Sequence, residues 1–220
     1  MVNGQVATKA SSMAGPDDLI DVFRGDHYVS RAAHKLAGAL AGAGVVVPAR
    51  VLDAGASTGG FTQVLLEAGA QVVYAVDVGH GQLVPELRAD PRVVVHEGLN
   101  LRDLTLDDTG GEPVDLVVAD ISFISLRLVL EQLFGVLSPT GSALLLVKPQ
   151  FEVGRKGLDS RGVVRDEDRR IRAVAEVAKA AAALGRRAAW QAESALAGES
   201  GNVEYFLHLV PAAPGVVSAG

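Results

Sequence analysis

Between residues 50 and 210, short runs of apolar residues alternate with segments of helical periodicity. The runs predict strands at 51–53, 72–78, 92–96, 115–120, 142–148, 187–192 and 203–210, and the segments before and between them predict helices at 30–41, 61–67, 125–137 and 166–184. Continuous apolar strands that alternate with helices are typical of parallel sheets buried on both faces. The pattern therefore predicts an α/β fold with a seven-stranded, mostly parallel sheet and helices on both faces.

The composition excludes several classes of protein. Hydrophobic residues make up 49% and charged residues 21% of the 220 residues, which excludes disorder for most of the chain. The absence of cysteine excludes disulfides, thiolate zinc sites and a cysteine nucleophile. The net charge of −6 excludes a globally basic nucleic-acid binder, although a locally basic face is compatible with it.

A glycine-rich turn at residues 55–60 follows the first strand and opens the next helix. It lacks the middle glycine of the dinucleotide fingerprint, which disfavours a pyrophosphate-containing cofactor. Asp77 ends the second strand 24 residues after Asp53, near the spacing of about 20 at which an acidic residue meets a ribose diol. The pattern favours a nucleoside without phosphates, such as S-adenosylmethionine. In the alternative interpretation, the two carboxylates only cap strand ends.

The same turn also fits the G-x-S-x-G nucleophile elbow of α/β-hydrolases, with Ser57 as the nucleophile. The remaining members of a triad would be Asp120 and His208. His208 lies in the middle of an apolar strand rather than on a loop, and no oxyanion loop precedes the turn. A hydrolase is therefore the less favoured interpretation.

Four charged residues occupy positions where a charge needs an explanation: Lys35, Asp120, Lys148 and Glu204. Asp120 and Lys148 end two apolar strands, and the carboxyl ends of parallel strands meet at the ligand-binding edge of a sheet. Lys35 lies on the helix before the first strand, on one side with Arg31 and His34, and Glu204 begins the last strand. Spacing alone leaves two separate ion pairs at the sheet ends as an alternative.

Several ordered strings resemble the TlyA family, a group of FtsJ-like ribose 2′-O-methyltransferases of bacterial rRNA that are often named haemolysins. The strings are YVSRAAHKL (28–36), DAGASTGGFT (53–62), DLVVADISFIS (115–125), LVKPQFE (146–152) and GNVEYF (201–206). The resemblance covers about residues 1–210 and implies the Rossmann-like class I methyltransferase fold, with an antiparallel closing strand in the sheet. It further implies S-adenosyl-L-methionine as cofactor, cytidine in rRNA or ribosomal subunits as substrate, and a cytoplasmic location.

The resemblance also assigns roles to residues of the site. It implies a catalytic tetrad of Lys35, Asp120, Lys148 and Glu204. A lysine acts as a base only when burial or a nearby cation lowers its pKa, and we expect Lys148 to be the base with Lys35 as the neighbouring cation. The implied cofactor contacts are Asp53, Gly55, Ser57, Gly59, Gly60, Phe61, Asp77 and Asn100.

Members of this family usually begin with a small RNA-binding module. We expect residues 1–26 to be a shortened form of it with a linker, residues 27–210 to form the methyltransferase domain and residues 211–220 to be a disordered tail. Basic residues around 155–172 follow the strand that ends in Lys148 and could contact phosphates, or could form a solvated loop. The predicted RNA contacts are Arg31, Arg155, Lys156, Arg161 and Arg165, and the candidates for stacking on a flipped base are Phe123, Phe151 and Tyr205.

Other functions have less support in the sequence. The five histidines show no metal-ligand spacing, so we predict no metal site. No apolar run reaches the roughly 20 residues of a membrane span, and no stable membrane association is expected of a haemolysin-like alternative. A catalytically idle RNA-binding or assembly factor is the remaining alternative, and the complete tetrad weighs against it.

Overall fold

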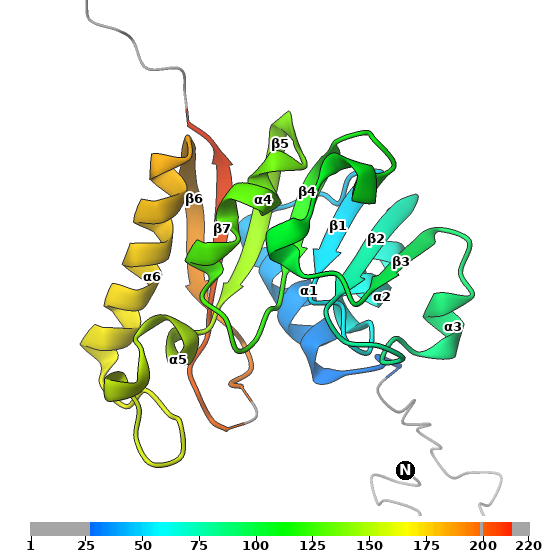
Figure 1. Ribbon diagram of the computed structural model, residues 1–220. Helices are drawn as coiled ribbons and strands as arrows, with labels where there is room; N and C mark the ends of the chain where they lie inside the picture. Colours follow the sequence, from blue (N-terminus) through cyan, green and yellow to red (C-terminus); the bar gives the residue numbers. More distant parts are fainter. Residues whose placement is uncertain (1–26, 199, 213–220) are drawn as a thin grey trace, which may run out of the picture.

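The structure is a computed structural model that describes residues 27–198 and 200–212. The expected N-terminal module at residues 1–26 and all but the first two residues of the expected tail lie outside this range. Figure 1 shows a twisted sheet flanked by helices, with the amino-terminal half of the described chain at one side and helix α6 at the other. The predicted α/β architecture is confirmed.

Seven strands form one sheet in the order β3-β2-β1-β4-β5-β7-β6. Their bounds are β1 Arg50–Ala54, β2 Val72–Asp77, β3 Val93–Glu97, β4 Val114–Ala119, β5 Leu137–Val147, β6 Arg186–Glu193 and β7 Tyr205–Pro211. Strands β1 to β5 pair in parallel, whereas β7 runs antiparallel to both of its neighbours. The antiparallel closing strand is thus present, and it is inserted between β5 and β6.

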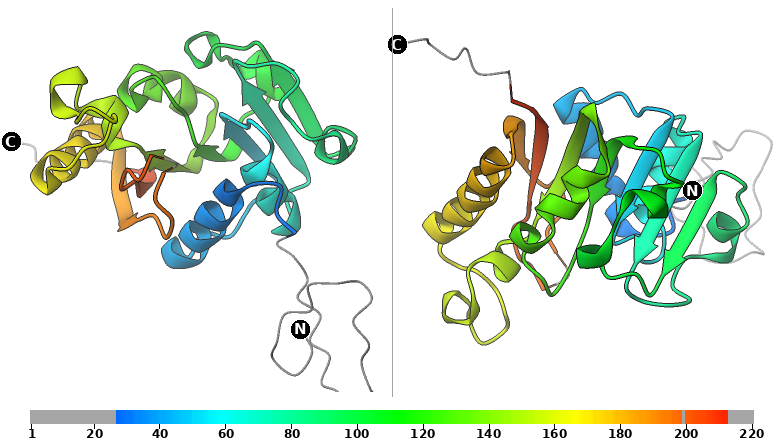
Figure 2. Two further views of the ribbon diagram at one scale, coloured as in Figure 1. Left: turned by 90° about the horizontal axis from the view of Figure 1, so that it is seen from below. Right: turned by 45° about the horizontal axis from the view of Figure 1, so that its top comes forward.

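Helices cover both faces of the sheet (Figure 2). Their bounds are α1 Arg31–Ala43, α2 Gly60–Glu67, α3 Pro85–Arg88, α4 Leu130–Gly135, α5 Pro149–Glu152 and α6 Glu167–Ala183, with short 3-10 turns η1 Leu101–Asp103, η2 Leu106–Thr109, η3 Leu126–Leu128 and η4 Arg155–Gly157. Apolar residues of α1, α2 and α3 pack in one core cluster, and those of α4 and α6 pack in the other. The sheet separates the two clusters, as the continuous apolar strands predict.

Two predicted boundaries are wrong. The helix expected at 125–137 is divided into η3 and α4, and β5 already begins at Leu137, five residues before the predicted strand. Ser125 caps η3 with its side chain, and the register between β4 and β5 shifts near their amino ends. The apolar periodicity of one segment does not reveal a side-chain cap or a shift in the register between two strands, so these boundaries could not be predicted from it.

The order of the strands reverses between β1 and β4, because the chain leaves β1 toward β2 and returns on the other side to form β4. In open α/β sheets, ligands bind at the carboxyl ends of the strands at such a switch point. The carboxyl ends of β1, β4 and β5 carry the glycine-rich turn, Asp120 and Lys148. The fold therefore brings the predicted site residues to one edge of the sheet.

Candidate active site

Two adjoining cavities open at the carboxyl ends of β1 and β4. The larger, of about 650 Å³, contains all four residues of the expected tetrad in its lining and is called here the tetrad cavity. The smaller, of about 440 Å³, contains Asp77 and Asn100 and is called the Asp77 cavity. The two share one group of lining residues, which consists of Gly55, Ser57, Asp120, Ser122 and Phe123.

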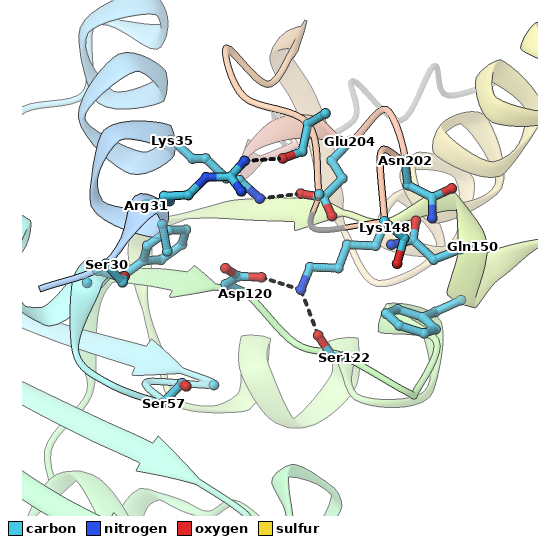
Figure 3. A pocket seen from close by; sticks show the side chains of 18 of the residues that line it. Ser30, Arg31, Lys35, Ser57, Asp120, Ser122, Lys148, Gln150, Asn202 and Glu204 are labelled. Carbon is cyan, nitrogen blue, oxygen red and sulfur yellow. Dashed lines mark hydrogen bonds and ion pairs between the residues drawn. The ribbon is translucent and has the colours of Figure 1, made fainter. Parts of the chain in front are cut away.

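Lys148 lines the tetrad cavity, and its ammonium lies between oxygen atoms of two residues that line both cavities, Asp120 and Ser122. Its Nζ lies 2.6 Å from Asp120 Oδ1 and donates a hydrogen bond of 2.7 Å to Ser122 Oγ (Figure 3). Lys148 follows β5 directly, and Asp120 follows β4, so the parallel pairing of these strands sets the side chains against each other. The ammonium is held at a cavity wall rather than in open solvent.

Lys35 and Glu204 form a second ion pair in the same cavity (Figure 3). Lys35 Nζ donates to Glu204 Oε2 at 2.7 Å, and both residues are buried. The structure therefore brings the four predicted residues together as two lysine–carboxylate pairs. Glu204 lies immediately before β7 rather than in the strand as expected. A buried charge is costly unless it is paired, so each of these two residues stabilises the other in the buried site.

The glycine-rich turn has a backbone that demands glycine at Gly55, where φ is +87°. A Cβ atom there would lie 2.6 Å from the backbone oxygen of Asp120, so the turn packs directly against the end of β4. Ser57 also has a positive φ, of 47°, and its backbone N–H donates to Asp77 Oδ2 at 2.8 Å. Asp77 thus holds the turn in place while it lines the smaller cavity.

The other residues of the turn differ in their position. Gly60 and Phe61 line the tetrad cavity, although Phe61 is buried and its ring stacks on Phe206 with centroids 6.3 Å apart. Gly59 lines neither cavity. A Cβ atom on Gly59 would meet the side chains of Leu83 and Leu87, so this glycine makes room for the protein itself.

Asp53 is fully buried behind the turn and does not line either cavity. Its Oδ2 accepts a hydrogen bond of 2.6 Å from Thr62 Oγ1, and its Oδ1 has no hydrogen-bond partner. Burial raises the pKa of Asp53 to about 7, although the Thr62 hydrogen bond acts in the opposite direction. A direct contact between Asp53 and a cofactor in these cavities is therefore not what this geometry offers.

The Asp77 cavity combines a carboxylate with apolar walls. Asp77 Oδ1 accepts from the Gly79 N–H at 2.7 Å, and the walls are formed by Val76, Val78, Leu101, Ile121 and Ile124. Asn100, another expected cofactor contact, also lines this cavity, and its side chain caps η1 by accepting from the Arg102 N–H at 3.1 Å. A flat apolar ring beside a carboxylate and an amide is the kind of ligand that fits these walls.

The predicted RNA contacts are divided between the cavity and its surroundings. Arg31 and Arg161 are exposed and line the tetrad cavity, and Arg31 donates to the Ala197 carbonyl at 3.1 Å. Arg155 is exposed outside the cavity lining. Arg165 is paired with Asp159 at 2.9 Å. Lys156 lies in η4, and its side chain is not described.

Several lining residues were not predicted from the sequence. Ser122 is the second partner of Lys148, and its position two residues after Asp120 in a strand-end loop was the available signal. Ser30 and Gln150 also line the tetrad cavity, and each has a buried side-chain oxygen without a hydrogen-bond partner. Asn202 is buried in the wall, where it accepts from the Val164 N–H at 3.0 Å and donates to the Gly162 carbonyl at 3.0 Å.

The geometry of the site excludes the predicted hydrolase triad of Ser57, Asp120 and His208. His208 pairs with Leu144 and Trp190 in the middle of β7 and lines neither cavity, whereas Ser57 and Asp120 line both. The Ser57 hydroxyl is 3.1 Å from Gln82 Oε1, to which it donates. A nucleophilic serine needs a base within hydrogen-bond reach, and the predicted base is elsewhere in the sheet.

Within residues 27–198 and 200–212, no helix is long and apolar enough to cross a membrane. The same part of the chain contains no group of three or more histidine, aspartate or glutamate residues arranged to hold a metal ion.

Comparisons with known proteins agree with this geometry. The family model of FtsJ-like methyltransferases matches residues 28–210. The Mycobacterium tuberculosis protein named 16S/23S rRNA (cytidine-2′-O)-methyltransferase TlyA is 55% identical over 183 residues, which are 83% of this chain and 68% of that protein. Hemolysin A of Brachyspira hyodysenteriae is 37% identical over 210 residues, or 95% of this chain and 88% of that one.

A solved structure shows the same fold. The crystal structure of a Lactococcus lactis protein described as a hemolysin superposes with a TM-score of 0.80 at 41% identity, and the match covers 83% of this chain and 88% of that chain. The family match includes all four residues of the two ion pairs and both cavities. The chain therefore belongs to the FtsJ-like methyltransferase family, within its TlyA group.

Proposed function

We propose that the chain transfers a methyl group from S-adenosylmethionine to the ribose 2′-hydroxyl of a cytidine in ribosomal RNA. The observation that carries the proposal is the position of Lys148, which lines the tetrad cavity and contacts Asp120 and Ser122, two residues that line both the tetrad cavity and the Asp77 cavity. A base at that position stands between a nucleoside site and a second site large enough for a substrate nucleotide. The names of the mycobacterial and Campylobacter jejuni relatives, both cytidine-2′-O-methyltransferases of rRNA, support the substrate.

The Asp77 cavity fits the adenosyl part of the cofactor. Asp77 keeps carboxylate lone pairs for a ribose diol beyond those used by Ser57 and Gly79, and the apolar walls suit an adenine ring. The glycine-rich turn would hold the remainder at Gly55 and Ser57, where it borders both cavities. When bound, S-adenosylmethionine supplies a methyl group activated by a positively charged sulfur.

The two ion pairs would divide the work of the transfer. The ribose hydroxyl is a weak acid, and it must lose its proton as the new oxygen–carbon bond forms and the sulfur–carbon bond breaks. Lys148, as the neutral amine, would accept that proton, while Asp120 and Ser122 fix its Nζ. Lys35, held by Glu204, would place a second cation beside the site.

The rim of the tetrad cavity would hold the RNA. Arg31 and Arg161 lie on its lining as exposed cations for phosphates. Phe123 is 93% exposed and packs against Phe151 with ring centroids 5.4 Å apart, so a flipped base could stack on it. Its φ of +67° is unusual for a bulky residue and marks a strained loop. An enzyme with this substrate would act in the cytoplasm, where ribosomes are.

The experiment is incubation of the purified full chain with methyl-labelled S-adenosylmethionine and unmodified ribosomal subunits. The RNA is then digested to nucleosides, and the label is identified by mass spectrometry. The proposal predicts label in 2′-O-methylcytidine. Label on a base, or absence of label from a protein that does not bind the cofactor, would refute it. Small and large subunits are assayed separately, which assigns the substrate.

A further inference from the structure

Glu152 is a buried carboxylate that no step of the proposed transfer uses. It ends α5, the short helix that follows Lys148, and its side chain is 2% exposed. Its Oε1 accepts from the Leu126 N–H at 2.8 Å. Its Oε2 accepts from Ser125 Oγ at 2.6 Å and from Arg127 Nε at 3.1 Å.

All of these donors belong to the segment that follows Asp120. The chain leaves β4, passes through Asp120, Ser122 and the strained Phe123, and enters η3 at Leu126. Glu152 therefore fastens the far end of this loop, while Lys148 contacts its near end at Asp120 and Ser122. Lys148 and Glu152 are four residues apart in the chain, and their polar contacts therefore connect the segment after β5 to the segment after β4 at two points.

The side chain of Arg127 adds a further contact between the same two segments. Its guanidinium donates to the Glu152 carbonyl at 3.3 Å, so Arg127 contacts both the side chain and the backbone of the same residue. A carboxylate with several charge-assisted or backbone hydrogen bonds is held firmly, and it orders the groups that donate to it. Without it, the buried Leu126 N–H and Ser125 hydroxyl would lose their partner.

We propose that Glu152 is a positioning residue for methyl transfer, which locks the loop 120–125 so that Asp120 and Ser122 hold Lys148 in the geometry for proton removal. The inference rests on the proposed function. A displacement of about 1 Å at a reacting group reduces a rate by about 100-fold. The role differs from that of the ion pairs, because Glu152 lines neither cavity and acts through the loop.

The test compares Glu152→Ala and Glu152→Gln with the wild type for kcat, RNA KM and cofactor Kd. We expect Glu152→Ala to lower kcat by about 10- to 100-fold with cofactor Kd within about twofold, because the loss is one of geometry. Glu152→Gln keeps an acceptor for the Leu126 N–H and should recover part of the rate. Unchanged kcat in Glu152→Ala would overturn the inference.

Arg186→Met is the matched control for stability. Arg186 is buried and donates to the Gly141 carbonyl at 2.6 Å, at the opposite end of β5 from Lys148. Both variants should lower the melting temperature, but only the Glu152 variants should lower kcat at a temperature where every variant is folded. If Arg186→Met loses kcat to the same extent, the effect is one of stability and the inference fails.

A second readout does not depend on methyl transfer and separates this inference from the proposed function. Trace acylation with acetic anhydride, read by mass spectrometry, gives the reactivity of Lys148 relative to the exposed Lys179. We expect a low ratio in the wild type and a ratio at least threefold higher in Glu152→Ala. An unchanged ratio would overturn the positioning role even if the RNA substrate proved to be wrong.

Discussion

Lys35 and Glu204 are 169 positions apart in the chain, yet Lys35 Nζ lies 2.7 Å from Glu204 Oε2 in a buried contact. Helix α1 therefore has a charged anchor to the residue that immediately precedes β7. The pair lines the tetrad cavity together with Asp120 and Lys148. It is a structural link across the domain as well as a part of the proposed site.

Removal of one partner of this pair should destabilise the protein. Glu204→Gln leaves the Lys35 ammonium buried without an anion, and we expect the free energy of unfolding to fall by about 3 kcal/mol. Lys35→Met should have an effect of similar size, and the double variant should lose less than the sum of the two. Urea denaturation of the three variants measures the coupling. Additive single effects would show that the contact contributes no coupling energy.

The position of Lys35 illustrates what a sequence pattern can and cannot predict. Helical spacing placed Lys35 on one side of α1 with Arg31 and His34, but the structure exposes those two and buries Lys35. A single helix does not reveal a carboxylate that arrives from the other end of the chain. Asp120 and Lys148 were easier to place, because each follows an apolar strand and parallel strands end at one edge of the sheet.

The cofactor contacts show a similar division. Six of the expected contacts line a cavity, namely Gly55, Ser57, Gly60, Phe61, Asp77 and Asn100, whereas Asp53 and Gly59 line neither. A sequence motif indicates that certain residues are needed near a turn. It does not distinguish residues that contact a ligand from residues that stabilise the turn itself. Asp53 instead accepts a hydrogen bond from Thr62, and the absence of a side chain at Gly59 leaves room for Leu87.

A Cβ atom at Gly55 should weaken cofactor binding. Gly55→Ala places a methyl group against the Asp120 carbonyl and strains a backbone with φ of +87°, so the turn must move. Gly69→Ala is the control, because Gly69 has φ of +104° but no neighbour within 4 Å of the added atom. Calorimetry should detect S-adenosylmethionine binding to the control and at least 10-fold weaker binding to Gly55→Ala. Equal affinities would contradict the assigned position of the cofactor.

The buried Asp53 predicts a specific dependence of stability on pH. Since burial raises its pKa to about 7, the folded state binds more protons than the unfolded state between about pH 4 and pH 7, and Asp53 destabilises the fold increasingly over that range. Asp53→Asn removes the effect and keeps an acceptor for Thr62. We expect the variant to equal the wild type near pH 4 and to exceed its stability at pH 8 by up to about 4 kcal/mol.

Urea denaturation at pH 4.5, 6 and 8 measures this difference. The gain from Asp53→Asn should grow with pH and become constant above pH 7. A gain that is independent of pH, or a variant less stable than the wild type at pH 8, would mean that folding does not raise the pKa of Asp53.

The stacked pair of Phe61 and Phe206 joins α2 to β7 in the core next to the tetrad cavity. Phe206 is 1% exposed, so Phe206→Ala should lower the free energy of unfolding by about 3–5 kcal/mol. Phe206→Leu keeps most of the volume and should lose about 1.5 kcal/mol or less. Thermal or urea denaturation of both variants checks the order, and equal losses would contradict the packing described for this ring.

The central claim is that Lys148 removes the proton from the ribose hydroxyl. Its most direct test is the single-turnover rate of methyl transfer to ribosomal RNA by Lys148→Ala, compared with Lys179→Ala as a control at an exposed lysine of α6. The account predicts that Lys148→Ala binds S-adenosylmethionine with nearly unchanged affinity and transfers the methyl group at least 100-fold more slowly, while Lys179→Ala behaves as the wild type. A Lys148→Ala enzyme that methylates at the wild-type rate would contradict it.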